Sequence, residues 1–273
     1  MLNYIIWNVN PSVFAFSDVP RWYGVLWALA LFLSYTVVTY IYKHEGRRVS
    51  EVDDITLYLV AGTFLGARLG HVFFYDPQYF WEHPSEILLP FRLQPEFEFI
   101  GFAGLASHGS AIGILLAIWI YSRMKKKSYL FVADRIVIGA SLAGGLIRLG
   151  NLMNSEMVGK PTDVPWAFIF KQVDLIPRHP AQLYEALFCF ALFVGLFLTW
   201  KKYYIVLPEG LLTGIFFFAL FVQRFINEFF KLSQVDFEDG WMINMGQILS
   251  LPFIVLGAYL IMRAYKIFTA RLR

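Results

Sequence analysis

Seven stretches of mostly apolar residues, each long enough to cross a membrane, constrain this chain more than any other feature of its sequence. A helix needs about 20 apolar residues to cross the hydrocarbon core of a bilayer. The stretches cover residues 22–42, 54–75, 101–121, 130–152, 181–200, 209–230 and 242–262 of the 273. The sequence therefore predicts an all-α membrane protein with seven transmembrane helices in one integral membrane domain over residues 1–273, with an outer loop or arm at 76–100.

The composition agrees with a membrane protein. The chain is 58% hydrophobic and 16% charged, which is too apolar for an ordinary soluble domain of this size. Its net charge of +3 gives no support for nucleic-acid binding. The single cysteine, Cys189, lies in an apolar run, so we expect a buried, inert thiol. The first ten residues lack a basic n-region, so no cleavable signal peptide is expected.

The distribution of lysine and arginine predicts the orientation. Loops on one side of the predicted helices hold thirteen of the 23 cations, and loops on the other side hold six. Because cytoplasmic loops carry the excess of Lys and Arg, the N-terminus is predicted to lie outside and the C-terminus in the cytoplasm. The larger set is Lys43, Arg47, Arg48, Arg123, Lys125, Lys126, Lys127, Lys201, Lys202, Arg263, Lys266, Arg271 and Arg273.

Four polar residues interrupt four different apolar stretches: Arg68, His108, Arg148 and Arg224. A charged side chain at the centre of a membrane helix costs about 2.5–3.5 kcal/mol on insertion scales, so such residues are usually paired, hydrated or functional. The predicted boundaries place all four at a similar depth in the outer half of the bilayer. They are the candidate site, whereas Arg135 is close enough to a cytoplasmic end to extend to the surface.

Each of these residues also has a structural interpretation. His108 is suited either to a hydrogen bond between helices or to catalysis. Arg148 is followed by Asn151, Asn154 and Glu156, which make a polar rim at the end of its helix. In the structural interpretation of that rim, Glu156 neutralises Arg148.

Arg224 and Arg68 leave similar alternatives open. Arg224 and Glu228 have the i, i+4 spacing of an intrahelical ion pair. Arg68 has no carboxylate one turn away, so its partner is expected on another helix or on an anionic ligand.

Other patterns indicate packing. Glycines within 101–113 and 139–150 predict close helix approach. Glu185 is explained by a helix start, because acidic residues favour the N-terminal turns. Tyr23 fits an aromatic belt at the membrane surface. Three polar residues are predicted to share one face of the last helix and to hydrogen-bond to a neighbour: Asn244, Gln247 and Ser250.

The candidate residues indicate a class of ligand. Cations and neutral hydrogen-bonding groups open to the outer leaflet suit the anionic headgroup of a phospholipid, and the planar guanidinium of Arg can hold phosphate through two nitrogens. The sequence contains no HExxH, P-loop or nucleophile-elbow serine. Transfer chemistry without a metal or cofactor, or simple anion binding, is therefore expected.

Five motifs in order resemble the prolipoprotein diacylglyceryl transferase family. They are GLASHGSAIG, LIRLGNLMNSE followed by Gly159, RHPAQLYEA, QRFINEFF and MGQILSLP, within a resemblance that runs from Arg21 to Pro252. The resemblance implies a multi-pass enzyme of the bacterial inner membrane with its active site facing the outer half of the bilayer. It implies transfer of the diacylglyceryl group of phosphatidylglycerol to the lipobox cysteine of a preprolipoprotein, with formation of a thioether and release of glycerol phosphate.

The resemblance also implies the site residues. The residues associated with substrate binding or activity match Tyr23, His108, Arg148, Asn151, Glu156, Gly159, Arg224 and Glu228, and Arg148 matches the arginine that binds phosphatidylglycerol. This chain departs from the family pattern at Ile147, at Ser155 in place of glycine, and at Lys231 in place of an arginine expected to make only a peripheral contact.

A thiol with a pKa near 8.5 is mostly protonated at neutral pH, so a base should help it attack. His108 is the predicted base, with the phosphate dianion or Glu156 as alternatives. Arg148 and Arg224 would stabilise the leaving phosphate, Asn151 and Glu156 would orient Arg148 or the headgroup, Glu228 would hold Arg224, and Tyr23 would donate to the headgroup.

Two functions from other classes compete with this one. A transporter or binding protein for an anionic lipid headgroup could use the same cations, although no repeated halves are visible in the sequence. A rhomboid-like intramembrane protease is less well supported, since Ser107 and Ser110 flank His108 but point off its helical face.

Overall fold

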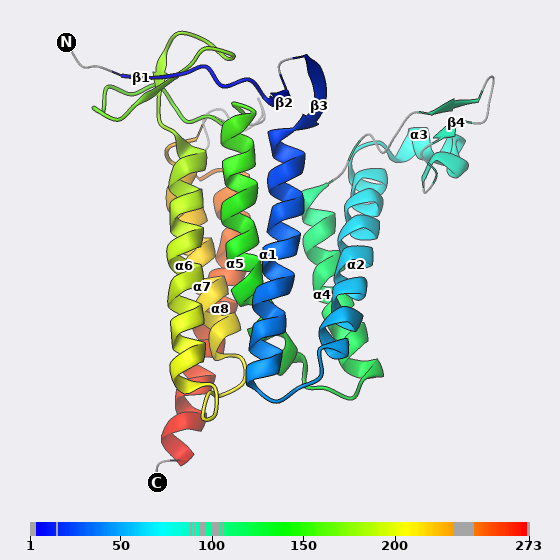
Figure 1. Cartoon of the computed structure of the whole chain (residues 1–273), viewed down its shortest axis with the longest axis vertical. Helices are drawn as coiled ribbons and strands as arrows, with labels where there is room; N and C mark the ends of the chain where they lie inside the picture. Colours follow the sequence, from blue (N-terminus) through cyan, green and yellow to red (C-terminus); the bar gives the residue numbers. More distant parts are fainter. Residues whose placement is uncertain are drawn as a thin grey trace. The chain divides into compact units, whose positions relative to one another are not determined.

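The computed structural model describes residues 4–14, 16–87, 89, 91–92, 97–99, 104, 106–231 and 243–271 (Figure 1). Within these residues the chain forms long helices where the apolar stretches predict them. They are α1 (Trp22–His44), α2 (Ser50–Phe74), α4 (Ser107–Met124), α5 (Tyr129–Met153), α6 (Ala181–Tyr203), α7 (Leu211–Asn227) and α8 (Met245–Arg271). Parts of the predicted arm 76–100, and residues 101–103 and 105 of the third predicted helix, lie outside the described residues.

Five of the long helices are long and apolar enough to cross a membrane: α1, α2, α5, α6 and α8. The 23 residues of α1, for example, rise about 35 Å, against a hydrocarbon core of about 30 Å. The α4 helix has 18 residues and α7 is an apolar helix of 17. The protein is thus a helical membrane protein, as predicted, and its seven-span count stays a prediction.

Short elements that the apolar pattern did not predict lie outside the long helices. They are α3 (Pro77–Glu82), the 3-10 helix η1 (Pro84–Ile87), β1 (Ile5–Trp7), β2 (Ser12–Phe14), β3 (Ser17–Arg21), β4 (Phe91–Arg92), β5 (Glu98–Phe99), β6 (Phe168–Phe170) and β7 (Pro177–Arg178). The strands β1, β6 and β7 form one sheet, in which β1 pairs parallel to β6 and β7 pairs antiparallel to it.

The chain divides into two compact units, and the first contains residues 1–41 and 133–273. It holds most of α1 and α5, all of α6, α7 and α8, and the β1–β6–β7 sheet. That sheet covers the end of α5, because Trp7 packs on a buried cluster with Leu152 and Phe168 and donates its indole N–H to the Leu152 carbonyl at 3.0 Å. The sheet therefore fixes the chain where α5 ends.

A buried carboxylate anchors the start of α7. Asp134 on α5 is fully buried and accepts hydrogen bonds from the Gly210 amide at 2.7 Å and the Thr213 amide at 2.8 Å. It also accepts one from the Thr213 hydroxyl at 2.7 Å. These amides belong to the first turn of α7, whose N–H groups have no partner within the helix. The neighbouring Arg135 is only 5% exposed, so the prediction that it extends to the surface is wrong.

Close helix approach in the first unit depends on glycine, as predicted. A Cβ added at Gly257 of α8 would lie 2.5 Å from the Phe218 amide nitrogen of α7. On α5, a Cβ at Gly144 would meet the sulfur of Cys189, which is buried as expected. Small residues thus bring α7 against α8 and α5 against α6.

The second unit, residues 42–132, is organised around the pair α2 and α4. Gly66 of α2 faces Gly109 of α4 so closely that a Cβ on Gly66 would lie 2.3 Å from the Gly109 carbonyl oxygen. Gly62 and Gly113 meet in the same way one turn further along. The glycine-rich run around His108 therefore has a packing function within this unit.

Candidate functional site

The buried carboxylate of Glu185, near the start of α6, is the centre of a polar cluster in the first unit. One of its oxygens lies 2.6 Å from Nε of Arg148 on α5, and the other lies 2.6 Å from Nζ of Lys231, which follows α7. Asn227, the last residue of α7, donates to Glu185 at 2.8 Å. The Glu185 side chain is only 5% exposed. The two cations and the amide offset the free-energy cost of burying its charge.

The local sequence explains why Glu185 points into this cluster. Pro180 precedes the first turn of α6, where its missing N–H costs nothing. Gln182 donates to the Glu156 carbonyl and so ties the start of α6 to the turn after α5. The positive end of the α6 dipole further stabilises a carboxylate in the second turn. The sequence pattern indicates only this helix start for Glu185 and does not predict its ion pairs.

The Arg148 guanidinium is held from two sides. Besides the Glu185 contact at Nε, its Nη1 donates to the Asn151 side-chain oxygen at 3.3 Å and contacts the Met157 sulfur at 3.3 Å. Nη2 donates no hydrogen bond within the described residues, and the side chain is 27% exposed. Arg148 is thus oriented but still has a free edge. The interpretation in which Glu156 neutralises Arg148 is wrong, because Glu185 does so.

Glu156 instead organises the turn that follows α5. Its two carboxylate oxygens accept hydrogen bonds from Asn151 at 3.1 Å and from Asn154 at 3.0 Å. The turn requires a left-handed residue at Ser155, with φ of 54°. The family pattern described above has glycine at this position, and glycine adopts such a φ without strain. Asn151 therefore lies between Glu156 and Arg148 and hydrogen-bonds to both.

Tyr23 and Gly159 also join this cluster. Tyr23, at the start of α1, packs on α5 so closely that a Cβ on Gly150 would lie 2.8 Å from the tyrosine ring, and the charges of Glu156 and Arg148 act on its hydroxyl. A Cβ on Gly159 would lie 2.5 Å from the His179 carbonyl oxygen. Gly159 also pairs with Lys231 in an isolated β-bridge. It thereby fixes the backbone of Lys231 beside Glu185, which is a positioning role.

Lys231 is central to the cluster, in contrast to the peripheral contact expected for it. Its side chain is 6% exposed, and its ammonium lies 2.6 Å from Glu185 and 3.6 Å from Glu228. The sequence does not predict this role, because Lys231 directly follows the motif QRFINEFF and its partner Glu185 is distant in the chain.

The predicted Arg224–Glu228 ion pair is absent from the described residues. The α7 helix ends at Asn227, so Glu228 turns toward the start of α8, where Asn244 donates to it at 3.2 Å. A Cβ on Gly246 would lie 2.8 Å from the Glu228 carboxyl carbon. Arg224 itself is half-buried in the last turn of α7.

Asn244 and Gln247 form a cap at the start of α8. The Gln247 backbone N–H donates to the Asn244 side-chain oxygen at 2.9 Å, and the Asn244 backbone N–H donates to the Gln247 side-chain oxygen at 3.0 Å. This reciprocal pattern satisfies free amides at a helix start. Gln247 also donates to the Phe225 carbonyl of α7 at 3.2 Å, so the predicted hydrogen bond between helices exists for this residue. Ser250 bonds to Gly246 within α8.

Arg68 and His108 belong to the second unit. Arg68 is 2% exposed, and its nitrogens donate to the carbonyls of Glu86 at 2.5 Å, Ile87 at 2.8 Å and Gly104 at 3.4 Å. It lies 4.7 Å from the Phe80 ring centroid. These partners come from α3, from η1 and from Gly104, which precedes α4. His108 is exposed in the first turn of α4 and not seven residues inside the helix, since α4 begins at Ser107.

These observations define a class. The first unit is a bundle of membrane helices in which one end carries an oriented arginine, a buried carboxylate and a buried lysine. Arg148 and Lys231 both pair with Glu185, Lys231 also lies 3.6 Å from Glu228, and Glu156 accepts a hydrogen bond from Asn151, so carboxylates offset the cations of this cluster. Such a network can present one guanidinium edge to an anionic ligand while its other charges remain paired.

The chain belongs to the prolipoprotein diacylglyceryl transferase family, whose model matches residues 11–263. A phosphatidylglycerol–prolipoprotein diacylglyceryl transferase from Bacteroides fragilis is 44% identical over 262 residues, covering 95% of each chain. A relative with the same name from Chloroherpeton thalassium is 42% identical over 97% of this chain and 96% of its own. One from Tolumonas auensis is 41% identical over 96% and 98%.

Proposed function

We propose that this chain transfers the diacylglyceryl group of phosphatidylglycerol to the lipobox cysteine of preprolipoproteins, the first step of lipoprotein maturation. Membership of the family and the names of relatives at 41–44% identity support this function. The observation in the site that carries it is the Arg148 guanidinium, which is held by Glu185 and Asn151 and keeps one free nitrogen. That arrangement suits the phosphate of a lipid headgroup.

The reaction is a displacement at carbon. The thiol sulfur attacks the glyceryl carbon bonded to a phosphate oxygen, the new C–S bond forms, and the C–O bond breaks with its electron pair passing to the phosphate. The products are a thioether-linked diacylglyceryl cysteine and glycerol phosphate. Arg148, with Arg224, stabilises the charge that develops on the leaving phosphate, a role in which one such donor contributes about 100- to 1,000-fold in rate elsewhere.

The surrounding residues position Arg148 and the headgroup. Asn151 and Glu156 orient the guanidinium through their hydrogen bonds, and the Tyr23 hydroxyl donates to the headgroup. Glu228 acts through Lys231 and Asn244 and not by holding Arg224. Arg68 keeps its predicted substrate role only if the carbonyl groups that now accept its hydrogen bonds release it.

The thiol proton needs an acceptor, and His108 is proposed for it. The imidazole is exposed and therefore accessible to a substrate. Its test is His108→Gln in the transfer assay across a pH range. Full activity with an unchanged pH profile would exclude the base role and favour the phosphate dianion or Glu156.

The proposed topology is seven spans in one membrane domain of the bacterial inner membrane, with the N-terminus and the Arg148 cluster toward the outside and the C-terminus in the cytoplasm. The cation distribution supports this orientation. Leu175, 74% exposed between β6 and β7, is a reporter position. In a Cys189→Ala background, Leu175→Cys should react with a membrane-impermeant maleimide added to intact spheroplasts. Reaction only after permeabilisation would reverse the orientation.

Mass spectrometry of a lipobox peptide tests the function. Purified full-length protein is incubated with phosphatidylglycerol and the peptide, and the expected product carries one diacylglyceryl group on its cysteine. A peptide with serine in place of that cysteine is the control and should stay unmodified. Movement of phospholipid across vesicles without any covalent product would instead support the transporter function.

A further inference from the structure

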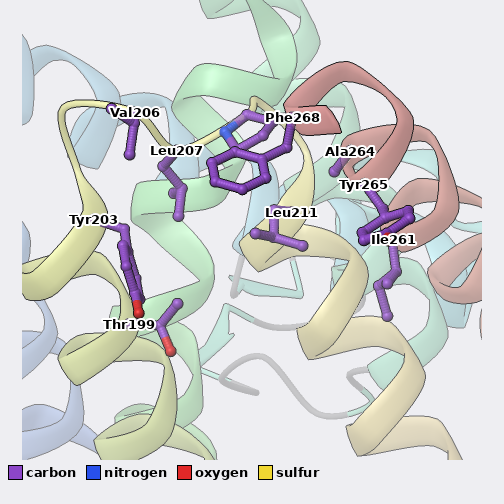
Figure 2. Close-up of a pocket in the computed structure, with 10 residues that line it drawn as sticks. Thr199, Tyr203, Val206, Leu207, Leu211, Ile261, Ala264, Tyr265 and Phe268 are labelled. Carbon is purple, nitrogen blue, oxygen red and sulfur yellow. The ribbon is translucent and has the colours of Figure 1, made fainter. Parts of the chain in front are cut away.

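An apolar groove lies at the end of the first unit that is remote from the Arg148 cluster. It has a volume of about 340 Å³ and is formed by the last turn of α6, the 204–210 loop, the start of α7 and the last turns of α8. Figure 2 shows Thr199 and Tyr203 on one wall, Ile261 and Tyr265 on the other, and Leu211 between them. Three helices and one loop of the same unit thus line the groove.

The groove and the Arg148 cluster lie at opposite ends of α6. Glu185 is in the second turn of this helix of 23 residues and Tyr203 is its last residue, which corresponds to a rise of about 27 Å. That distance is close to the hydrocarbon thickness of about 30 Å. A molecule in the groove therefore lies at the other face of the membrane and cannot be the lipid that reacts at Arg148.

The lining of the groove demands an apolar occupant. Its one aliphatic hydroxyl, on Thr199, already donates to the Gly195 carbonyl of its own helix at 2.7 Å. Tyr203 and Tyr265 are 44% and 68% exposed, as is common for tyrosines that lie where hydrocarbon meets headgroups. With this apolar lining beside the headgroup region, the groove suits part of a hydrocarbon chain.

Charge around the groove specifies the headgroup. Four exposed or half-buried cations lie on the ends of α6 and α8 that flank the groove, against one carboxylate, Glu209, in the 204–210 loop. The cations are Lys201, Lys202, Arg263 and Lys266. Lys202 lies 5.0 Å from the ring centroid of Tyr203, which keeps its ammonium beside the groove. Basic residues at such helix ends attract anionic phospholipids.

We propose that this groove is a second, non-catalytic lipid site, which holds one acyl chain of an anionic phospholipid while Lys202 and Lys266 contact its phosphate. The site combines an apolar groove with a surplus of cations near its edge. A lipid bound there joins α6, α7 and α8 at the end of the bundle where the 204–210 loop connects two of them.

Native mass spectrometry of the delipidated full-length protein in detergent tests this site. Dioleoyl phosphatidylglycerol and dioleoyl phosphatidylcholine are titrated against wild type, Thr199→Trp, which fills the groove, and Leu198→Trp, a matched change at a side chain that is 56% exposed and outside the groove. We expect Thr199→Trp to bind one phosphatidylglycerol fewer, or the second one at least tenfold more weakly, and Leu198→Trp to behave as wild type. Equal binding by the two variants would overturn the proposal.

The charge requirement is tested by surface changes that leave the fold intact. The double variant Lys202→Gln, Lys266→Gln should bind phosphatidylglycerol with a smaller affinity ratio over phosphatidylcholine. Each lost lysine should lower this ratio about fivefold. Lys160→Gln with Lys171→Gln, at the other end of the unit, is the control and should not. An unchanged preference in the first double variant would exclude an anionic lipid.

Failure of this site is distinguishable from failure of the proposed activity. Thr199→Trp should retain diacylglyceryl transfer within about twofold, because the groove is far from Arg148. Arg148→Ala should retain the groove lipid. Loss of the groove lipid in Arg148→Ala would mean that both lipids occupy one site and would overturn the inference.

Discussion

Arg148 and Arg68 are the same residue type near the ends of two long apolar helices, yet their surroundings differ. Arg148 contacts a carboxylate and an amide and is 27% exposed, whereas Arg68 is 2% exposed beneath three carbonyl groups and the Phe80 ring. Carbonyl groups satisfy the N–H groups of a guanidinium and leave no free edge. An arginine within an apolar helix is thus a candidate for ligand binding only when its partners leave donors open to the surroundings.

The largest expected effect is on Arg148. Arg148→Ala should reduce the rate of diacylglyceryl transfer about 100- to 1,000-fold, because it removes the donor for the leaving phosphate. The measurement is the initial rate of lipobox-peptide modification, with Arg68→Ala assayed in parallel. If Arg68→Ala lost more activity than Arg148→Ala, the distinction between the two arginines would be wrong.

The second largest effect is expected at Glu185, the carboxylate that pairs with Arg148. Glu185→Gln leaves Lys231 buried beside a neutral amide, and breaking a buried pair in this way costs about 3–5 kcal/mol. We expect a lower Tm in detergent and a 10- to 100-fold lower transfer rate. Glu82→Gln, at an exposed position, is the control. A normal Tm would mean that Glu185 contributes little to the bundle.

Lys231 provides a conservative test of the same network. Lys231→Met should lower the transfer rate about tenfold, whereas Lys231→Arg should stay within about threefold of wild type, since arginine can still pair with Glu185 and Glu228. Equal rates for both variants would restore the peripheral role first expected for this residue.

Arg68→Ala should act mainly on local structure. Loss of the hydrogen bonds to Glu86 and Ile87 should increase protease cleavage within residues 77–87 severalfold, with transfer reduced less than fivefold. Arg68→Lys should not restore protection, because an ammonium cannot reproduce the planar set of donors. Protection in Arg68→Lys equal to that of wild type would show that charge alone is sufficient.

The smallest effect is expected outside the helices, at Asp174. Hydrogen bonds from Arg178, and from the Ile176 amide, hold the pKa of the Asp174 carboxyl below its ordinary value. A depressed pKa contributes stability above the ordinary value, near 3.9, which is lost as pH falls through the folded value. Asp174→Asn should therefore lower Tm slightly at pH 7 and flatten the fall in Tm below about pH 4. Asp163→Asn should leave the profile unchanged.

Helices and the Arg148 motif were predictable because both are local. Long apolar runs define α1, α2, α5, α6 and α8, and Asn151 lies one turn from Arg148 on the same helix. The ion pairs of Glu185 were not predictable, since Arg148 and Lys231 come from segments far from it in the chain. Glu185 does lie near the start of α6, as predicted, but this position alone does not indicate its ion pairs with Arg148 and Lys231.

The predicted start of the third helix was wrong, because the backbone conformation there does not follow the hydropathy. The third helix was predicted from residue 101, but Gly104 has a φ of 80° and Ala106 is extended, so α4 begins at Ser107. This places His108 in the first turn and not inside the membrane helix. Strands of two to five residues, such as β1 and β6, are too short to show an alternating pattern.

The cap on α7 has a consequence for biosynthesis. With 17 residues, α7 rises only about 26 Å, and its first amides are satisfied by Asp134, which is separated from Gly210 by 76 positions in sequence. A helix of this length is a weak candidate for independent insertion by the translocon. We expect α7 to depend on α5 already being in the bilayer, so a nascent chain with Asp134→Ala should leave α7 partly uninserted in a glycosylation-mapping assay.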